Sequence, residues 1–158
     1  MRLVVQLFIG AASLVLPALA MMSPAVAQGS NFVATPAKAA VIPVTLPARM
    51  PERIFLDLWV RAYTPPKRGA VEAVVTLGKG ERGIEVGRFA MFPSEPFVAT
   101  DASQQRAYRF DATSAVAAFK GERELTAQVR LVPIDEKVPA DGAQLTIDRA
   151  ELSPPPPP

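Results

Sequence analysis

Apolar side chains alternate with other types over residues 53–63, and this period restricts the fold more than any other feature. One set of alternate positions is entirely aliphatic and consists of Ile54, Leu56, Leu58, Val60 and Ala62. The other set mixes rings with charges and consists of Phe55, Asp57, Trp59, Arg61 and Tyr63. Because successive side chains of a strand point to opposite faces of a sheet, the pattern predicts a strand with one buried face. An amphipathic helix would repeat its apolar positions every three or four residues, so the pattern excludes one here.

Similar alternating segments recur along the chain and are separated by turn signals. The glycine-rich residues 78–83 suit a hairpin loop, because a phosphate-binding loop would lead into a helix and here another strand follows. Residues 97–105 have the composition of a polar loop, and residues 113–119 fit one short helix that ends at Gly121. Besides 53–63, we expect strands at residues 41–46, 71–77, 84–92, 106–111, 124–132 and 143–152. The sequence therefore predicts an all-β fold, an antiparallel β-sandwich of six or seven strands with one short helix.

Two of these segments carry irregularities that predict local geometry. In residues 143–152 the apolar positions change phase, so we expect a β-bulge near Asp148 and Arg149. In residues 41–46, Pro43 lacks the backbone N–H that a central strand must donate. We therefore expect this segment at the edge of a sheet.

The first 27 residues have the composition of a secretory signal peptide. Arg2 precedes an apolar stretch, and the small residues Ala25 and Ala27 precede Gln28 as a cleavage site requires. We expect a periplasmic or secreted protein with no membrane contact after cleavage; the alternative is that the segment is kept as an anchor. The expected organisation is a signal peptide at 1–27, an Ala/Pro-rich lead-in at 28–51, the β-sandwich at 52–153 and a poly-proline tail at 154–158.

The absence of histidine and cysteine narrows the chemistry available to this chain. Without thiolate or imidazole there is no disulfide, no Ser-His-Asp triad and no ordinary zinc or copper site. With 17 Lys and Arg against 15 Asp and Glu, the formal net charge of +2 provides no concentrated basic field for nucleic acid. The acidic residues match neither a calcium-binding loop nor a carboxylate pair for glycoside hydrolysis. We therefore expect no enzymatic activity, no cofactor and no nucleic-acid partner.

The ring-bearing face of residues 53–63 is the candidate partner or ligand surface. Its aromatic residues alternate with an acid and a base, which is unusual for a face that contacts only water. Side chains two positions apart on a strand stand about 6.6 Å apart, and Trp and Arg are frequent interface anchors. The alternative is that the rings pack under the loop at 93–105 or under the helix. The candidate surface comprises Phe55, Asp57, Trp59, Arg61 and Tyr63.

Four fragments in the second half of the chain together resemble a known domain. They are GRFAMF at 87–92, YRFDAT at 108–113, VRLVPID at 129–135 and LTIDRAEL at 145–152. Their order and spacing are similar to the C-terminal β-sandwich domain that follows the copper domain in tyrosinases and polyphenol oxidases. In that family a Lys-Phe-Asp-Val element opens a late strand, and the matching positions here are Arg109, Phe110 and Asp111. The resemblance implies that these three residues have a structural role in the domain and no catalytic or metal-binding role.

The resemblance implies a domain that packs on a catalytic domain and shields its dinuclear copper. The family's copper ligands are histidines of the other domain, so no metal-binding or catalytic residue carries over to this chain. We therefore expect a non-catalytic, exported accessory module that docks on a partner protein, with a tyrosinase-like copper oxidase as the candidate partner. The alternatives are a periplasmic carbohydrate- or small-ligand-binding module that uses the aromatic face, and an enzyme that relies on carboxylates alone.

Overall fold

The computed structural model describes residues 31–91 and 94–155. The predicted signal peptide and the last three residues of the predicted tail lie outside this range. No helix in the described part of the chain is both long and apolar enough to cross a membrane. The strands are β1 (Phe32–Ala34), β2 (Ala40–Thr45), β3 (Phe55–Thr64), β4 (Val71–Lys79), β5 (Arg82–Ala90), β6 (Phe97–Val98), β7 (Arg106–Asp111), β8 (Glu124–Pro133) and β9 (Gln144–Ser153). The helical segments are the 3-10 turn η1 (Ala102–Gln104) and the helix α1 (Thr113–Ala118).

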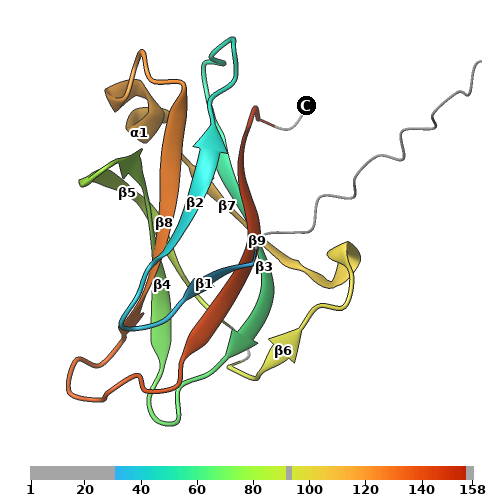
Figure 1. Cartoon of the computed structure of the whole chain (residues 1–158), viewed down its shortest axis with the longest axis vertical. Coiled ribbons are helices and arrows are strands. Elements are labelled where there is room, and N and C mark those ends of the chain that lie inside the picture. The colour runs from blue at the N-terminus through green and yellow to red at the C-terminus, as the bar shows by residue number, and fades with distance from the viewer. Residues whose placement is uncertain (1–30, 92–93, 156–158) are drawn as a thin grey trace, which may run out of the picture.

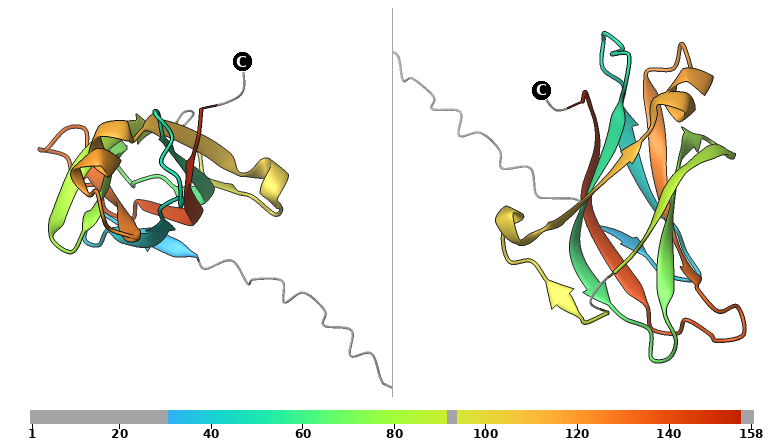
Figure 2. Two further views of the ribbon diagram at one scale, coloured as in Figure 1. Left: turned by 90° about the horizontal axis from the view of Figure 1, so that it is seen from above. Right: turned by 180° about the vertical axis from the view of Figure 1, so that it is seen from behind.

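Two antiparallel sheets pack face to face, as Figures 1 and 2 show. The five-stranded sheet has the order β1-β9-β3, and both β6 and β7 pair with the remaining side of β3. The four-stranded sheet has the order β2-β8-β4-β5. This arrangement confirms the predicted all-β sandwich with one short helix, and it makes β3 the central strand of its sheet.

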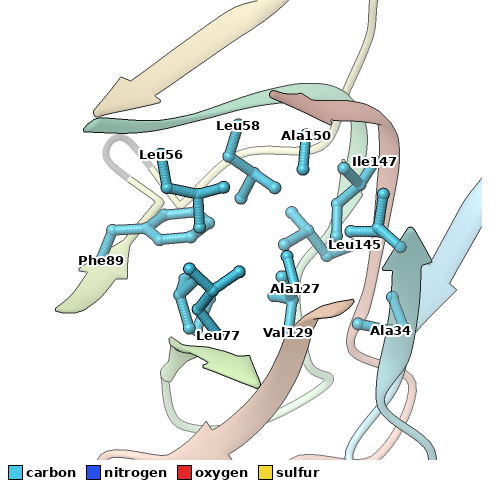
Figure 3. Close-up of a cluster of buried hydrophobic side chains, with 14 of the residues drawn as sticks. Ala34, Leu56, Leu58, Leu77, Phe89, Ala127, Val129, Leu145, Ile147 and Ala150 are labelled. Carbon is cyan, nitrogen blue, oxygen red and sulfur yellow. The ribbon is translucent and has the colours of Figure 1, made fainter. Parts of the chain in front are cut away.

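The core fills the space between the inner faces of the two sheets. The aliphatic positions of the alternating segment are buried up to Val60, as the sequence predicts. Each fully buried aliphatic side chain contributes about 1.5–3 kcal/mol relative to an exposed one. Figure 3 shows inward side chains of both sheets pointing toward one another, among them Leu56, Leu58, Leu77, Val129 and Ile147.

The described chain has nine strands rather than the predicted six or seven. The additional strands are β1, within the segment predicted as a lead-in, and β6, within the predicted loop at 97–105. They contain three and two residues, which is too short for an alternating pattern to be recognised. The predicted edge strand with Pro43 is confirmed, because β2 pairs only with β8 in its sheet. The sheets therefore begin at Phe32, before the predicted start of the sandwich at residue 52.

A β-bulge interrupts the pairing of β9 with β3. Trp59 pairs with Arg149, whereas the next residue, Val60, pairs with Ile147. The register therefore skips Asp148, which is a bulge at the predicted position. The extra residue reconciles the two apolar phases of β9 because it returns the later residues to the core face.

A second register shift lies in β3 itself and was not predicted. Val60 pairs with Ile147, and Ala62 pairs with the adjacent Thr146, so the register skips Arg61. The shift reverses the phase of β3 after Val60. Tyr63, which we expected on the outer face, is therefore part of the core and only 2% exposed.

Two glycines of the β4-β5 hairpin provide a matched test of its close pairing. A Cβ atom at Gly78 would lie 1.9 Å from the carbonyl oxygen of Arg82, whereas one at Gly83 would meet Thr76 at an ordinary 3.5 Å. We expect Gly78→Ala to lower the free energy of unfolding by about 2 kcal/mol or more, since the two backbones must separate. Gly83→Ala should change it by less than about 0.5 kcal/mol. Urea unfolding measures the free energy of unfolding of both variants. Equal losses of stability in Gly78→Ala and Gly83→Ala would contradict this hairpin register.

Candidate functional site

The structure brings together three of the five residues of the predicted surface. Phe55, Asp57 and Trp59 lie on the outer face of the five-stranded sheet, opposite the aliphatic face of β3. Arg61 lies at the register shift, where its guanidinium donates to Asn31 Oδ1 at 3.4 Å. Tyr63 points into the core and cannot contribute to an outer surface.

Neighbouring strands supply the other side chains of this face. Antiparallel pairing places β7 on one side of β3 and β9 on the other, and paired residues share a face of the sheet. Asp57 therefore lies between Arg109 and Glu151, and Trp59 lies beside Arg149. We call the following residues the outer-face cluster: Phe55, Asp57, Trp59, Arg109, Arg149 and Ser153.

The centre of the outer-face cluster is the carboxylate of Asp57, whose side chain is only 9% exposed. Arg109 of β7 donates to it twice, from Nε at 2.6 Å and from Nη2 at 2.9 Å. The Ser153 hydroxyl of β9 donates to the same carboxylate at 2.6 Å. A buried charge is tolerated only with such partners, and a bidentate guanidinium is the strongest that a protein offers. These hydrogen bonds join three adjacent strands of the sheet.

The burial of Asp57 and its hydrogen bonds act on its pKa in opposite directions. Burial raises the pKa, because it penalises the charged carboxylate. The hydrogen bonds from Arg109 and Ser153 and the charge of Arg109 lower it, and together they outweigh burial. The pKa of Asp57 therefore lies below its ordinary value of 3.8, and the carboxylate is charged at neutral pH.

Arginine side chains cover the two rings of the cluster. The guanidinium of Arg149 lies 4.0 Å from the centroid of the Trp59 ring, and those of Arg53 and Arg109 lie 5.1 and 5.6 Å from that of Phe55. These are cation-π distances. Arg149 is also held by acidic and amide side chains: Asp148 at 2.9 Å, Glu151 at 3.1 Å and Gln105 at 3.2 Å. The rings and guanidinium groups thus form an ordered layer over the middle of the sheet.

The remaining residues of the fragment that resembles the tyrosinase domain connect β7 to other elements. Phe110 faces inward, with its ring 6.0 Å from that of Phe89 on β5. Asp111 accepts from the backbone N–H of Thr113 at 3.0 Å and from Arg53 at 3.0 Å. Hydrogen bonding by Thr113 and Arg53 lowers the pKa of Asp111 to about 2. Asp111 therefore links the end of β7 to the start of α1.

A pocket that we did not predict lies at one end of the sandwich. It has a volume of about 750 Å³ and lies between the loop at 46–54 and the segment from α1 to residue 123. Figures 1 and 2 both show this loop and α1 at the same end of the molecule. The sequence carries only a weak signal for this pocket, which is a run of apolar residues in a loop. One of these residues, Met50, is 47% exposed in the structure. The apolar lining of the pocket, which defines what we call the end pocket, consists of Leu46, Pro47, Ala48, Met50, Pro51, Ile54, Val116 and Ala117.

Residues 31–91 and 94–155 contain no group of three or more acidic residues placed to hold a metal ion. Comparisons of the chain with protein-family models, with curated proteins and with solved structures found no match. The relation to the tyrosinase domain therefore stays a hypothesis that rests on the four fragments alone.

The titration of Asp57 tests whether Arg109 governs the outer-face cluster. Because the folded pKa is depressed, the stability that this group contributes is complete above pH 3.8 and is lost as the pH falls through the folded pKa. In Arg109→Leu, burial remains while the guanidinium is gone, so we expect the pKa of Asp57 to rise. Carboxyl carbon NMR measures this directly. Arg61→Leu is the matched control and should leave the titration unchanged; the same result in Arg109→Leu would contradict the assignment.

Proposed function

We propose that this protein is an exported, non-catalytic binding module that docks on a partner protein through the outer-face cluster. The observation that carries the proposal is the stack of Arg149 on Trp59, beside the ion pair that Arg109 forms with the buried carboxylate of Asp57. Trp and Arg are the residues most enriched at the centres of protein interfaces. Here contacts within the chain hold them in place, which reduces the side-chain entropy lost on docking.

The charge balance of the outer face favours a protein partner with a mixed polar surface. Four arginines lie on or beside the cluster, namely Arg53, Arg61, Arg109 and Arg149, and each contacts a polar or acidic group of the same surface. The acidic groups there are also four: Asp57, Asp111, Asp148 and Glu151. A surface of such balanced charge suits a protein and gives no attraction for the phosphates of nucleic acid.

A tyrosinase-like copper oxidase is the partner that we propose to test first. The four fragments that resemble the tyrosinase C-terminal domain support this choice. Since the chain has no histidine, any type-3 copper in such a complex would be held by the partner's residues. The accessory chain would cover its partner rather than take part in the oxidation.

The outer-face cluster is less suited to a carbohydrate than to a protein. A sugar ring that stacks on tryptophan needs an open aromatic face, and Arg149 already lies 4.0 Å from the centroid of the Trp59 ring. A sugar would have to displace this guanidinium, which is also bound by Asp148 and Glu151. We therefore place the protein partner ahead of the carbohydrate alternative for this surface.

Replacement of Trp59 tests the docking surface. We expect Trp59→Ala to weaken binding of the purified exported protein to a tyrosinase-like oxidase of the same organism by about tenfold or more, since central tryptophans carry much of the binding free energy. Surface plasmon resonance measures the affinity, and the fluorescence of this single tryptophan should change on docking of the native chain. Val41→Ala is the control, because Val41 is 50% exposed and lies on the other sheet.

Two outcomes would contradict this proposal. Equal affinity of Trp59→Ala and Val41→Ala would exclude the outer-face cluster as the docking surface. Failure of the native chain to bind any such oxidase would exclude the proposed partner.

A further inference from the structure

We propose that the end pocket binds an amphiphile that carries one carboxylate group. Its apolar body would lie between the loop at 46–54 and α1, and its carboxylate would lie at Lys120 and Arg123 on the rim. This site uses none of the side chains of the outer-face cluster, so it is a second activity beyond protein docking.

The size and lining of the end pocket fit a small apolar ligand. Its volume of about 750 Å³ falls within the roughly 300–1,000 Å³ that is typical of sites for small molecules. Ile54 and Val116, which belong to the core and are 2% and 1% exposed, form its deep part. Leu46, Met50 and Ala117 add further apolar surface. Transfer of a hydrocarbon body from water to such a lining is favourable.

The backbone of the loop over the pocket is hydrogen-bonded to the described part of the chain only near its two ends. At one end the Leu46 N–H donates to the Arg123 carbonyl at 3.0 Å. At the other end the Ile54 N–H donates to Thr113 Oγ1 at 3.1 Å, and the Ile54 carbonyl accepts from Ala112 at 2.9 Å. Between these points, residues 47–53 make no backbone hydrogen bond to any described part of the chain. A ligand that displaced residues 47–53 would therefore break no backbone hydrogen bond of either sheet.

The charges on the rim select for a carboxylate. Lys120 and Arg123 both line the pocket, and neither forms an ion pair with any residue in 31–91 or 94–155. Of the two acidic residues in the lining, Glu122 is already bound to Lys79, which leaves Glu52. The rim thus offers two unpaired cations against one unpaired acid. Charge-assisted hydrogen bonds from ammonium and guanidinium groups to a carboxylate are stronger than neutral ones.

Two adjacent alanines of α1 allow a matched test of the pocket. Both are exposed, but Ala117 lines the pocket and Ala118 does not. We expect sodium decanoate, below its micellar concentration, to bind the purified exported protein saturably and to shift the backbone amide signals of Ile54 and Val116 in NMR spectra. Ala117→Trp fills the pocket and should weaken binding by about tenfold or more, whereas Ala118→Trp should leave it unchanged. Absence of saturable binding, or equal binding by the two variants, would overturn the proposal.

A charge-matched pair of variants tests the carboxylate. Lys120→Gln with Arg123→Gln should weaken decanoate binding by about tenfold but leave the binding of decanol unchanged, since only the acid uses the cations. Lys38→Gln with Lys137→Gln removes the same charge from exposed positions elsewhere and should have no effect. Equal affinity of the native protein for decanol and decanoate would overturn the assignment of a carboxylate. Trp59→Ala should bind decanoate normally, so this test and the docking test can fail independently.

Discussion

The buried carboxylate of Asp57 is the interaction on which the outer face of the five-stranded sheet depends. It lies on the central strand, and its partners Arg109 and Ser153 come from the strands on either side. A charge in this position would be costly without both neighbours, so the carboxylate favours one register of three strands. Arg109 also extends over the ring of Phe55, which links the ion pair to the aromatic layer. The proposed docking surface is therefore ordered by contacts that the fold already requires.

Much of this architecture could be predicted from the sequence, because alternation reports directly on burial. The strand that contains Trp59 and the aliphatic face from Ile54 to Val60 are both evident in the pattern. The bulge at Asp148 could be predicted because the apolar phase visibly changes within one strand. The order of the strands could not be predicted from the sequence, because alternation shows which face of a strand is buried and not which strands lie beside it.

The features that the sequence did not predict depend on contacts between segments far apart in the chain. The shift at Arg61 escaped prediction because Ala62 and Tyr63 are both compatible with either face, and only pairing with β9 decides between them. Tyr63 was consequently assigned to the wrong side of the sheet. The contact of Asp57 with Ser153 joins residues that are 96 positions apart, so no local pattern could reveal it.

The end pocket was missed for a related reason. Its two walls, the loop at 46–54 and the segment around α1, are separated by about half the domain and meet only in the folded chain. Most of the first wall belongs to the Ala- and Pro-rich segment 28–51, which we expected to be a lead-in to the sandwich and not the wall of a pocket. In the structure, Leu46 and Met50 instead line the same pocket as Val116 and Ala117 of α1. The fold thus presents two distinct features, the outer-face cluster on a sheet and the end pocket at one end of the sandwich.

The most direct test of this account is a double-mutant cycle between Asp57 and Arg109. Unfolding free energies of the native chain, Asp57→Ala, Arg109→Ala and the double variant give the coupling between the two side chains. Because Arg109 donates two hydrogen bonds to the buried carboxylate, we predict a favourable coupling, reduced by solvent because Arg109 is 46% exposed. Single-variant effects that add to the double-variant effect within about 0.3 kcal/mol would show that this pair does not order the outer face, and would contradict the account.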